Sequence, residues 1–332
     1  MVGIFKHKNP GNALLLILYG LVLKFPLFIH PVKPIPQPGD NYIYVLIVRF
    51  LDPIGSSAPV IYSLIAFLLF FTQATLLNRI LNSLKLFPRQ NYLVGMSFIL
   101  ITSLMKDWIF FSAPLLVNSL MIWIWYRMVG LYSNSNPKTS IYNVSVLVGL
   151  LPLIYSPAIA FLLMLVMALI TTRPLRLAEW MVALLGIITP YYFLFVILFL
   201  TDRWQLSKVT PLLTFHLPKL PSSLWITGGI VLLFIPFLFG AYFVQKNLNK
   251  MLIQVRKAWS LLLVFLIVAF LIILLNPAGG YLHWMLVVVP IATFHAATYY
   301  YTTSKWFAAL IHWISFVFAI LVTYGVFENF VY

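Results

Sequence analysis

The sequence is dominated by long apolar stretches that alternate with short polar segments. Eleven such stretches lie at about residues 11–29, 58–77, 92–104, 108–126, 141–155, 157–171, 178–200, 224–244, 258–275, 281–300 and 306–327. About 20 mostly apolar residues in a helix cross the hydrocarbon core of a bilayer, so most of these stretches are long enough to span one. The short stretches at 92–104 and 141–155 are expected to be tilted or to extend into loops. The pattern predicts an all-α, polytopic transmembrane helix bundle of about 11 spans.

The composition supports a membrane protein and excludes two other classes. Hydrophobic residues make up 63% of the chain and charged residues 8%, whereas soluble domains have roughly 45–50% apolar and about 25% charged residues. Disordered chains have low hydrophobicity, so disorder is excluded as well. The absence of cysteine removes disulfides and thiolate-bound metals. We therefore expect one integral membrane domain over residues 1–332, with no separate soluble domain.

The charges are distributed unevenly between the two sides that this span count defines. The chain has 21 Lys+Arg, 6 Asp+Glu and a net charge of +15. With the N-terminus inside, 14 cations fall on the inner side, six on the outer and one, Lys24, within the first span, whereas Glu179 is the single acid on the inner side. Cations are retained on the cytoplasmic side of membrane proteins. The pattern predicts an N-in, C-out membrane protein, and its basic charge reflects topology and not nucleic-acid binding.

The first outer loop, residues 30–57, combines a proline-rich segment with a short apolar segment. Prolines at positions 31, 34, 36 and 38 exclude a helix in its first part. Residues 42–51 are apolar but too short to span a bilayer, and Asp40 and Asp52 bound them. This segment, which carries Arg49, is typical of a helix that lies in the membrane interface.

Two outer carboxylates are the candidate catalytic groups. Asp40 follows Gly39 and precedes the interfacial segment, so it is either an N-cap or turn residue or a general base at the outer face. Asp107 lies between the third and fourth spans, either in a local ion pair with Lys106 or as a second acid in the same outer cavity. If the two carboxylates meet, they could hold a divalent cation through oxygen ligands, and no other cofactor is expected.

Two cations near the outer face are candidates for binding a substrate phosphate. Lys24 lies within the first span, where an ionisable residue suggests a function; the alternative is that its side chain snorkels to the interface. Arg49 could bind phosphate or simply anchor the interfacial segment. His295 and His312 lie within spans, where we expect hydrogen bonds across helices and not metal ligation.

Two resemblances add to these expectations. The segments 172–193 (TRPLRLAEWMVALLGIITPYYF) and 86–92 (LFPRQNY) resemble a family of multi-spanning Bacteroidota inner-membrane proteins of unknown function. Residues 10–200 are also similar in layout to the GT-C superfamily of lipid-linked sugar transferases, which would leave 201–332 as four further spans. Asp40 matches the acid of the first outer loop in that superfamily, and Asp107 matches the acid of the next. The segment 149–158 (GLLPLIYSPA) is similar in position to a segment that often carries a lysine in that superfamily, but here it contains no lysine.

The GT-C resemblance implies a glycosyltransferase that uses a polyprenyl-phosphate-linked sugar at the periplasmic face. Asp40 would deprotonate or orient the acceptor, Lys24 or Arg49 would neutralise the leaving phosphate, and Asp107 would hold a metal. One alternative is a non-catalytic subunit of an envelope machine, with a membrane-protein partner bound in the bilayer or at loops 30–57 and 201–223. Another is a lipid or solute transporter, which would place polar groups near the midplane. Convergence of Asp40, Asp107 and Lys24 in one outer cavity would favour the transferase.

Overall fold

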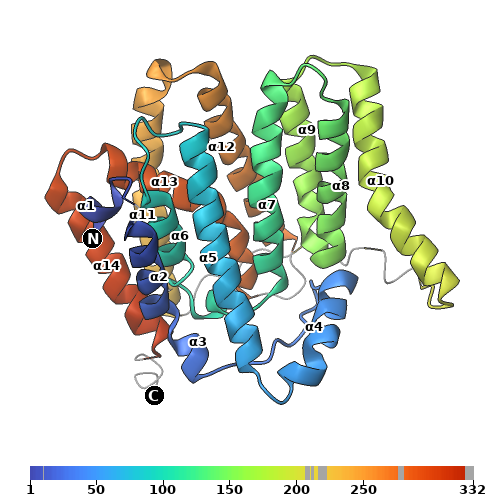
Figure 1. Cartoon of the computed structure of the whole chain (residues 1–332), viewed down its shortest axis with the longest axis horizontal. Helices are drawn as coiled ribbons and strands as arrows, with labels where there is room; N and C mark the ends of the chain where they lie inside the picture. Colours follow the sequence, from blue (N-terminus) through green and yellow to red (C-terminus); the bar gives the residue numbers. More distant parts are fainter. Residues whose placement is uncertain (10, 206–209, 211–212, 216–222, 276–279, 326–332) are drawn as a thin grey trace.

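The computed structural model describes residues 1–332 except 10, 206–209, 211–212, 216–222, 276–279 and 326–332 (Figure 1). The described residues form helices and loops and contain no β-strand. The elements are α1 (Val2–Phe5), α2 (Gly11–Lys24), α3 (Pro26–Ile29), α4 (Tyr42–Gly55), α5 (Val60–Ser83), α6 (Leu93–Ile101), η1 (Lys106–Ile109), α7 (Ala113–Gly130), η2 (Leu131–Ser133), α8 (Lys138–Ile154), η3 (Ser156–Ala160), α9 (Phe161–Thr172), α10 (Leu177–Leu200), α11 (Leu224–Asn247), η5 (Leu248–Lys250), α12 (Ile253–Leu274), η6 (Leu282–Val287), α13 (Val288–Tyr301) and α14 (Lys305–Thr323).

Seven helical segments of the described chain are long and apolar enough to cross a membrane. They are α5, α7 with η2, α10, α11 with η5, α12, η6 with α13, and α14. Helix α2, helix α8 and the η3–α9 segment are apolar but shorter. The first apolar stretch is divided into α2 and α3 at Pro26, whose ring nitrogen cannot donate a backbone hydrogen bond. The prediction of an all-helical membrane protein is thus confirmed in its general form.

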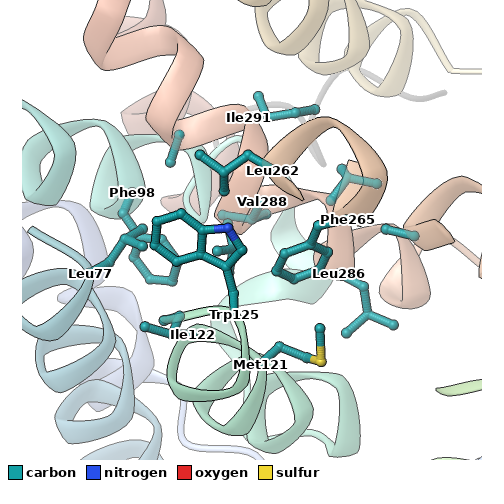
Figure 2. Close-up of a cluster of buried hydrophobic side chains, with 14 of the residues drawn as sticks. Leu77, Phe98, Met121, Ile122, Trp125, Leu262, Phe265, Leu286, Val288 and Ile291 are labelled. Carbon is teal, nitrogen blue, oxygen red and sulfur yellow. The ribbon is translucent and has the colours of Figure 1, made fainter. Parts of the chain in front are cut away.

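The hydrophobic core lies where α5, α6, α7, α12 and α13 meet. Trp125 of α7 is fully buried there, and Figure 2 shows its indole surrounded by apolar side chains from these helices. Phe98 of α6 and Phe265 of α12 approach it from different sides. Residues 288–299 of α13 are all buried, so α13 is the central helix of the bundle. Helices that are apolar all round are expected at such a position.

Glycines allow α8 and α10 to approach each other closely at two levels. A Cβ atom at Gly149 would lie 2.5 Å from the backbone oxygen of Ile187, and one at Gly186 would lie 2.6 Å from the Cβ of Ser145. Small residues at helix interfaces let two backbones pack together in membrane proteins. Helix α10 is therefore fixed against α8, and most of its remaining surface is apolar and exposed.

The loops gather at two opposite ends of the bundle. One end, the upper one in Figure 1, carries segments 1–9, 84–92, 131–137, 172–176, 248–252 and 302–304, and we call it the basic end. The Tyr92 N–H donates to the Phe5 carbonyl at 2.8 Å, and the Arg89 N–H donates to the Tyr300 hydroxyl at 3.1 Å. Arg173 forms an ion pair with Glu179, the acid that the charge pattern placed on this side.

The opposite end carries α4 and the first long loop. In Figure 1, α4 lies below α7 and α8, next to the lower end of α5. The predicted interfacial segment is a helix in the structure and extends four residues beyond residue 51, to Gly55. Its inner face buries Tyr44 and Val48, whereas Phe50 is 82% exposed. This distribution of apolar side chains on two faces suits a helix held against the bundle on one side and against lipid on the other.

Candidate functional site

A pocket of about 380 Å³ opens at the end of the bundle that carries α4. We call it the outer pocket. Its walls come from the first long loop, from α4, from the segment around η1, from the α8–η3 junction and from the start of η6. Its lining residues are Val32, Lys33, Pro34, Ile35, Gln37, Gly39, Asp40, Tyr44, Asp107, Phe110, Phe111, Ser112, Tyr155, Gly280, Tyr281, Leu282 and His283. Four regions that are far apart in the sequence, residues 32–44, 107–112, 155 and 280–283, thus contribute to a single site.

Backbone hydrogen bonds fix the first long loop to the end of α8. The Ser156 N–H donates to the Gly39 carbonyl at 2.8 Å, and the Asn41 N–H donates to the Ile154 carbonyl at 3.0 Å. Asp40 and Tyr155 pair as an isolated antiparallel bridge. A Cβ atom at Gly39 would lie 2.9 Å from the Tyr155 ring, so glycine permits this close approach. The proline-rich loop, which cannot form a helix, is therefore held in one position over the pocket.

The N-cap of α4 is Asn41. An N-cap role was one of the two expectations for Asp40, and Asp40 does not perform it. The Asn41 Oδ1 accepts from the Tyr42 N–H at 2.7 Å, and its Nδ2 donates to the Pro152 carbonyl at 2.8 Å. Asparagine and aspartate are equally suited to an N-cap, so the residue types alone did not decide between the two positions. Because Asn41 performs this role, the Asp40 carboxylate is left to face the pocket.

The Asp40 carboxylate is half-buried, and its two oxygens have different surroundings. Oδ2 accepts from the Gln37 N–H at 2.8 Å, and the Asp40 N–H donates to the Gln37 carbonyl at 2.9 Å, which closes a turn. Oδ1 is buried and has no hydrogen-bond partner. Burial raises the pKa of Asp40 to about 6, and the Gln37 N–H partly opposes this effect. A carboxylate with one free oxygen and a pKa near the working pH has the properties of a general base.

Tyr44 and Tyr155 are buried beside Asp40. Burial raises the pKa of both hydroxyls, and the negative charge of Asp40 raises it further. The Tyr44 hydroxyl donates to the Phe111 carbonyl at 3.3 Å, which links α4 to the segment that precedes α7. Both phenols therefore remain neutral at physiological pH, and they form an apolar wall with polar tips around the carboxylate.

Asp107 lies in η1, on another wall of the same pocket. The side chain of its neighbour Trp108 is fully buried and donates from Nε1 to the Tyr281 carbonyl at 2.8 Å, which fixes η1 against the segment before η6. Burial raises the pKa of Asp107, and the positive charge of Lys106 partly opposes this effect. Asp107 also lines a neighbouring cavity of about 400 Å³ next to Trp225. The structure thus brings Asp40 and Asp107, 67 positions apart in the sequence, to one pocket.

Lys24 and Arg49, the expected phosphate ligands, do not line this pocket. Lys24 is fully buried, donates from Nζ to the Thr102 carbonyl at 3.1 Å and lies 3.8 Å from the centre of the Phe70 ring. It therefore interacts with the C-terminal end of α6, where a cation is favoured by the helix dipole. Arg49 is exposed on α4 next to Phe50, as expected of an interfacial anchor.

The pocket contains a different cation, Lys33, which the charge pattern identified only as one of the six outer cations. Lys33 forms an ion pair with Asp52 and donates to the Ser56 hydroxyl at 3.1 Å. Its side chain is 44% exposed, so this pair can open without burying a lone charge. The sequence signal was present, because Lys33 lies in the same loop as Asp40, seven residues before it.

Tyr281 and His283 are two further polar lining residues that were not among the candidates from the sequence. Both begin an apolar stretch and were assigned to the interior of a span. In the structure η6 starts at Leu282, so this part of the stretch lies at the rim of the pocket. His295, by contrast, makes the expected bond across helices, with Nε2 2.7 Å from the Leu233 carbonyl oxygen.

The pocket has few ligands for a metal. Among the described residues, no cluster of three or more His, Cys, Asp or Glu side chains could hold an ion. Asp40 and Asp107 supply two carboxylates. Mg²⁺ is commonly bound by one or two carboxylates, with phosphate and water oxygens completing the octahedron. A divalent cation here would therefore take most of its ligands from a phosphorylated substrate.

Comparison with known proteins assigns no family to this arrangement. No protein-family model, no curated protein and no solved structure matches the chain.

Proposed function

We propose that this protein is a membrane-embedded glycosyltransferase that uses a polyprenyl-phosphate-linked sugar in the outer pocket. The single observation that carries the proposal is that Asp40 and Asp107 line one pocket together with Lys33. The resemblance in layout to GT-C transferases points to the same two carboxylates. A scaffold subunit would need neither a free carboxylate oxygen in a pocket nor a raised pKa, and such features concentrate at functional sites.

In the proposed reaction Asp40 acts as the base. Its free Oδ1 accepts the proton of an acceptor hydroxyl while the hydroxyl oxygen forms a bond to the anomeric carbon of the sugar. The bond between that carbon and the phosphate oxygen breaks, and polyprenyl phosphate leaves with the electron pair. One glycosidic bond replaces one glycosyl-phosphate bond, and no oxidant or reductant is required.

The leaving phosphate needs compensation for its growing negative charge. Lys33 lines the pocket and would release Asp52 to form an ion pair with the phosphate. It thus takes the role that we first expected for Lys24 or Arg49. Asp107 would orient the acceptor or share a divalent cation with the phosphate. Fixed charges in a site partly screened from water provide large stabilisation of this kind.

Cells that lack the protein should accumulate the lipid-linked donor, and this tests the proposed function. Wild-type protein should restore the normal lipid profile in a deletion strain, whereas Asp40→Asn should not, as measured by mass spectrometry of extracted polyprenyl-phosphate sugars. An unchanged profile on deletion would contradict the transferase.

The proposed activity requires the outer pocket to face the periplasm of a bacterial inner membrane. We propose the N-in, C-out arrangement with about 11 crossings, in which the shorter helices α2, α6, α8 and α9 also cross the membrane. The grouping of Arg173, Lys257 and the other inner cations at the basic end supports this direction, because cations are retained inside.

The absence of cysteine provides a direct test of this topology. Ser57→Cys, beside α4, should react with a membrane-impermeant maleimide in intact cells. Ser135→Cys, in the α7–α8 loop, should react only after permeabilisation. Both serines are exposed, so accessibility to the reagent is set by the membrane. Labelling of Ser135→Cys but not Ser57→Cys from outside would reverse the orientation and remove the proposed access to a periplasmic substrate.

A further inference from the structure

A second cavity, of about 610 Å³, lies at the basic end between α1, the end of α13 and the first half of α14. Its polar lining includes Lys6, His7, Tyr299, Lys305 and His312. None of the residues that line it is acidic. The cavity is on the opposite side of the bundle from the outer pocket and shares no lining residue with it.

His312 is the most unusual residue of this cavity. Its side chain is fully buried, and neither Nδ1 nor Nε2 has a hydrogen-bond partner. The ring stacks against Tyr19 at 5.9 Å and against Phe316 at 6.0 Å, with interplanar angles of 24° in both cases. Burying an unpaired polar group costs free energy, and native proteins rarely leave one without a reason. We expected a bond across helices for this histidine, and the structure shows none.

A second unpaired group lies beside it. The hydroxyl of Tyr299 is fully buried and also has no partner, and its ring contacts His312 edge-on at 6.3 Å. His295, on the same helix as Tyr299, shows the usual outcome, since one of its ring nitrogens binds a backbone carbonyl. Two adjacent buried donors that line one cavity therefore point to an acceptor that comes from outside the chain.

The electrostatic surroundings of the cavity favour an anion. Lys6 is half-buried, with Nζ 5.7 Å from the centre of the Tyr300 ring, and Lys305 is exposed at the start of α14. The 19-residue helix α14 directs its N-terminal end, capped by Ser304, toward this side. Helix N-termini attract phosphate through free N–H groups and the helix dipole. Trp313, 47% exposed, adds an apolar rim.

We propose that this cavity binds the phosphate group of an anionic membrane phospholipid. His312 and Tyr299 donate hydrogen bonds to phosphate oxygens, Lys6 and Lys305 compensate the charge, and the acyl chains lie along the exposed apolar surface of α14 next to Trp313. Anionic lipids are abundant in the cytoplasmic leaflet, and basic pockets between helices on that side bind their headgroups. This inference rests on the proposed N-in orientation and does not depend on the proposed transferase activity.

The test uses the full chain, purified and delipidated in detergent. Dioleoylphosphatidylglycerol should raise its unfolding temperature, whereas dioleoylglycerol, which has the same chains and no phosphate, should not. Native mass spectrometry should show one retained phosphatidylglycerol. An equal shift with inorganic phosphate would assign the site to free phosphate instead of the lipid, and equal shifts with both lipids would overturn the proposal.

Two variants connect the effect to the cavity. His312→Phe keeps the aromatic stack and removes both ring nitrogens, and Lys6→Gln/Lys305→Gln removes one half-buried and one exposed cation. Each should weaken phosphatidylglycerol binding about tenfold or more, the effect of losing a hydrogen bond to a charged group. The matched control Lys138→Gln/Lys250→Gln removes two exposed cations of the basic end outside the cavity. Wild-type binding in both cavity variants would overturn the proposal.

Discussion

Asp40→Asn is expected to lower the rate of sugar transfer by about 10²–10⁴-fold, the usual contribution of general base catalysis. Asparagine keeps the shape of the side chain and can still accept from the Gln37 N–H, but it cannot take a proton. The measurement is the transfer rate in proteoliposomes that contain a polyprenyl-phosphate-linked sugar and an acceptor. Substrate binding should change little, so the loss should appear in kcat.

The pH profile gives this prediction a second readout. The base is active when ionised, and burial raises the pKa of Asp40 to about 6. The wild-type rate should therefore be constant well above pH 6 and decrease as the pH falls through about 6. Asp40→Asn should retain a low rate without this acid limb. A variant that keeps the wild-type rate and the same limb would show that another group is the base.

The same pKa shift means that Asp40→Asn should not unfold the protein. Folding raises the pKa from its ordinary value of 3.8 to about 6, so the fold favours the protonated form. The resulting contribution to stability is present below the ordinary value and is lost as the pH rises through about 6. Asparagine avoids this loss at neutral pH. Asp202→Asn is the matched control, because Asp202 is an exposed acid outside the pocket whose φ of 53° asparagine also adopts.

Glu179→Gln is expected to cause the largest loss of stability, about 3–5 kcal/mol, which is typical when one partner of a buried ion pair is removed. The side chains of Arg173 and Glu179 are 12% and 5% exposed, and two hydrogen bonds of 3.1 and 3.2 Å join them. Arg173 also donates to the Asn134 carbonyl at 2.9 Å, so the pair connects the α7–α8 loop to α10. The variant leaves a buried guanidinium without its counter-ion.

The measurement is the thermal unfolding of the purified protein in detergent. Asp52→Asn is the informative control, because it breaks the exposed ion pair with Lys33, and exposed pairs contribute little. The double variant Arg173→Met/Glu179→Leu should recover much of the loss, since it leaves no buried charge unpaired. Equal effects of Glu179→Gln and Asp52→Asn would mean that the buried pair does not stabilise the bundle.

The elements of the fold that could be predicted from the sequence are those set by local pattern. The apolar segment 42–51 predicted the helix that became α4, although this helix continues past Asp52 to Gly55. A shared outer cavity was one of two alternatives for Asp107, and the resemblance in layout pointed to the same two carboxylates. Their meeting depends on how the loop of residues 31–41 lies against α8, and no local pattern specifies a contact between positions 39–41 and 154–156.

Lys24, which we expected to bind the substrate phosphate, does not line the outer pocket, and the reason is physical. A lysine inside an apolar stretch suggests a function, yet Lys24 finds a carbonyl partner at the end of α6 and an aromatic face at Phe70. Lys33 looked ordinary because its loop is polar. Lys33 lines the pocket because it lies in the loop after α3, which also carries Asp40.

The most direct test of the account is to locate the site that binds polyprenyl phosphate. A photoactivatable polyprenyl phosphate should cross-link to the reconstituted protein, and peptide mapping should place the adducts in segments 31–45, 105–113 and 280–283, which line the outer pocket. Excess unlabelled polyprenyl phosphate should compete, and Lys33→Gln should reduce the yield. Adducts confined to the basic end, or labelling that polyprenyl phosphate does not compete for, would contradict the account.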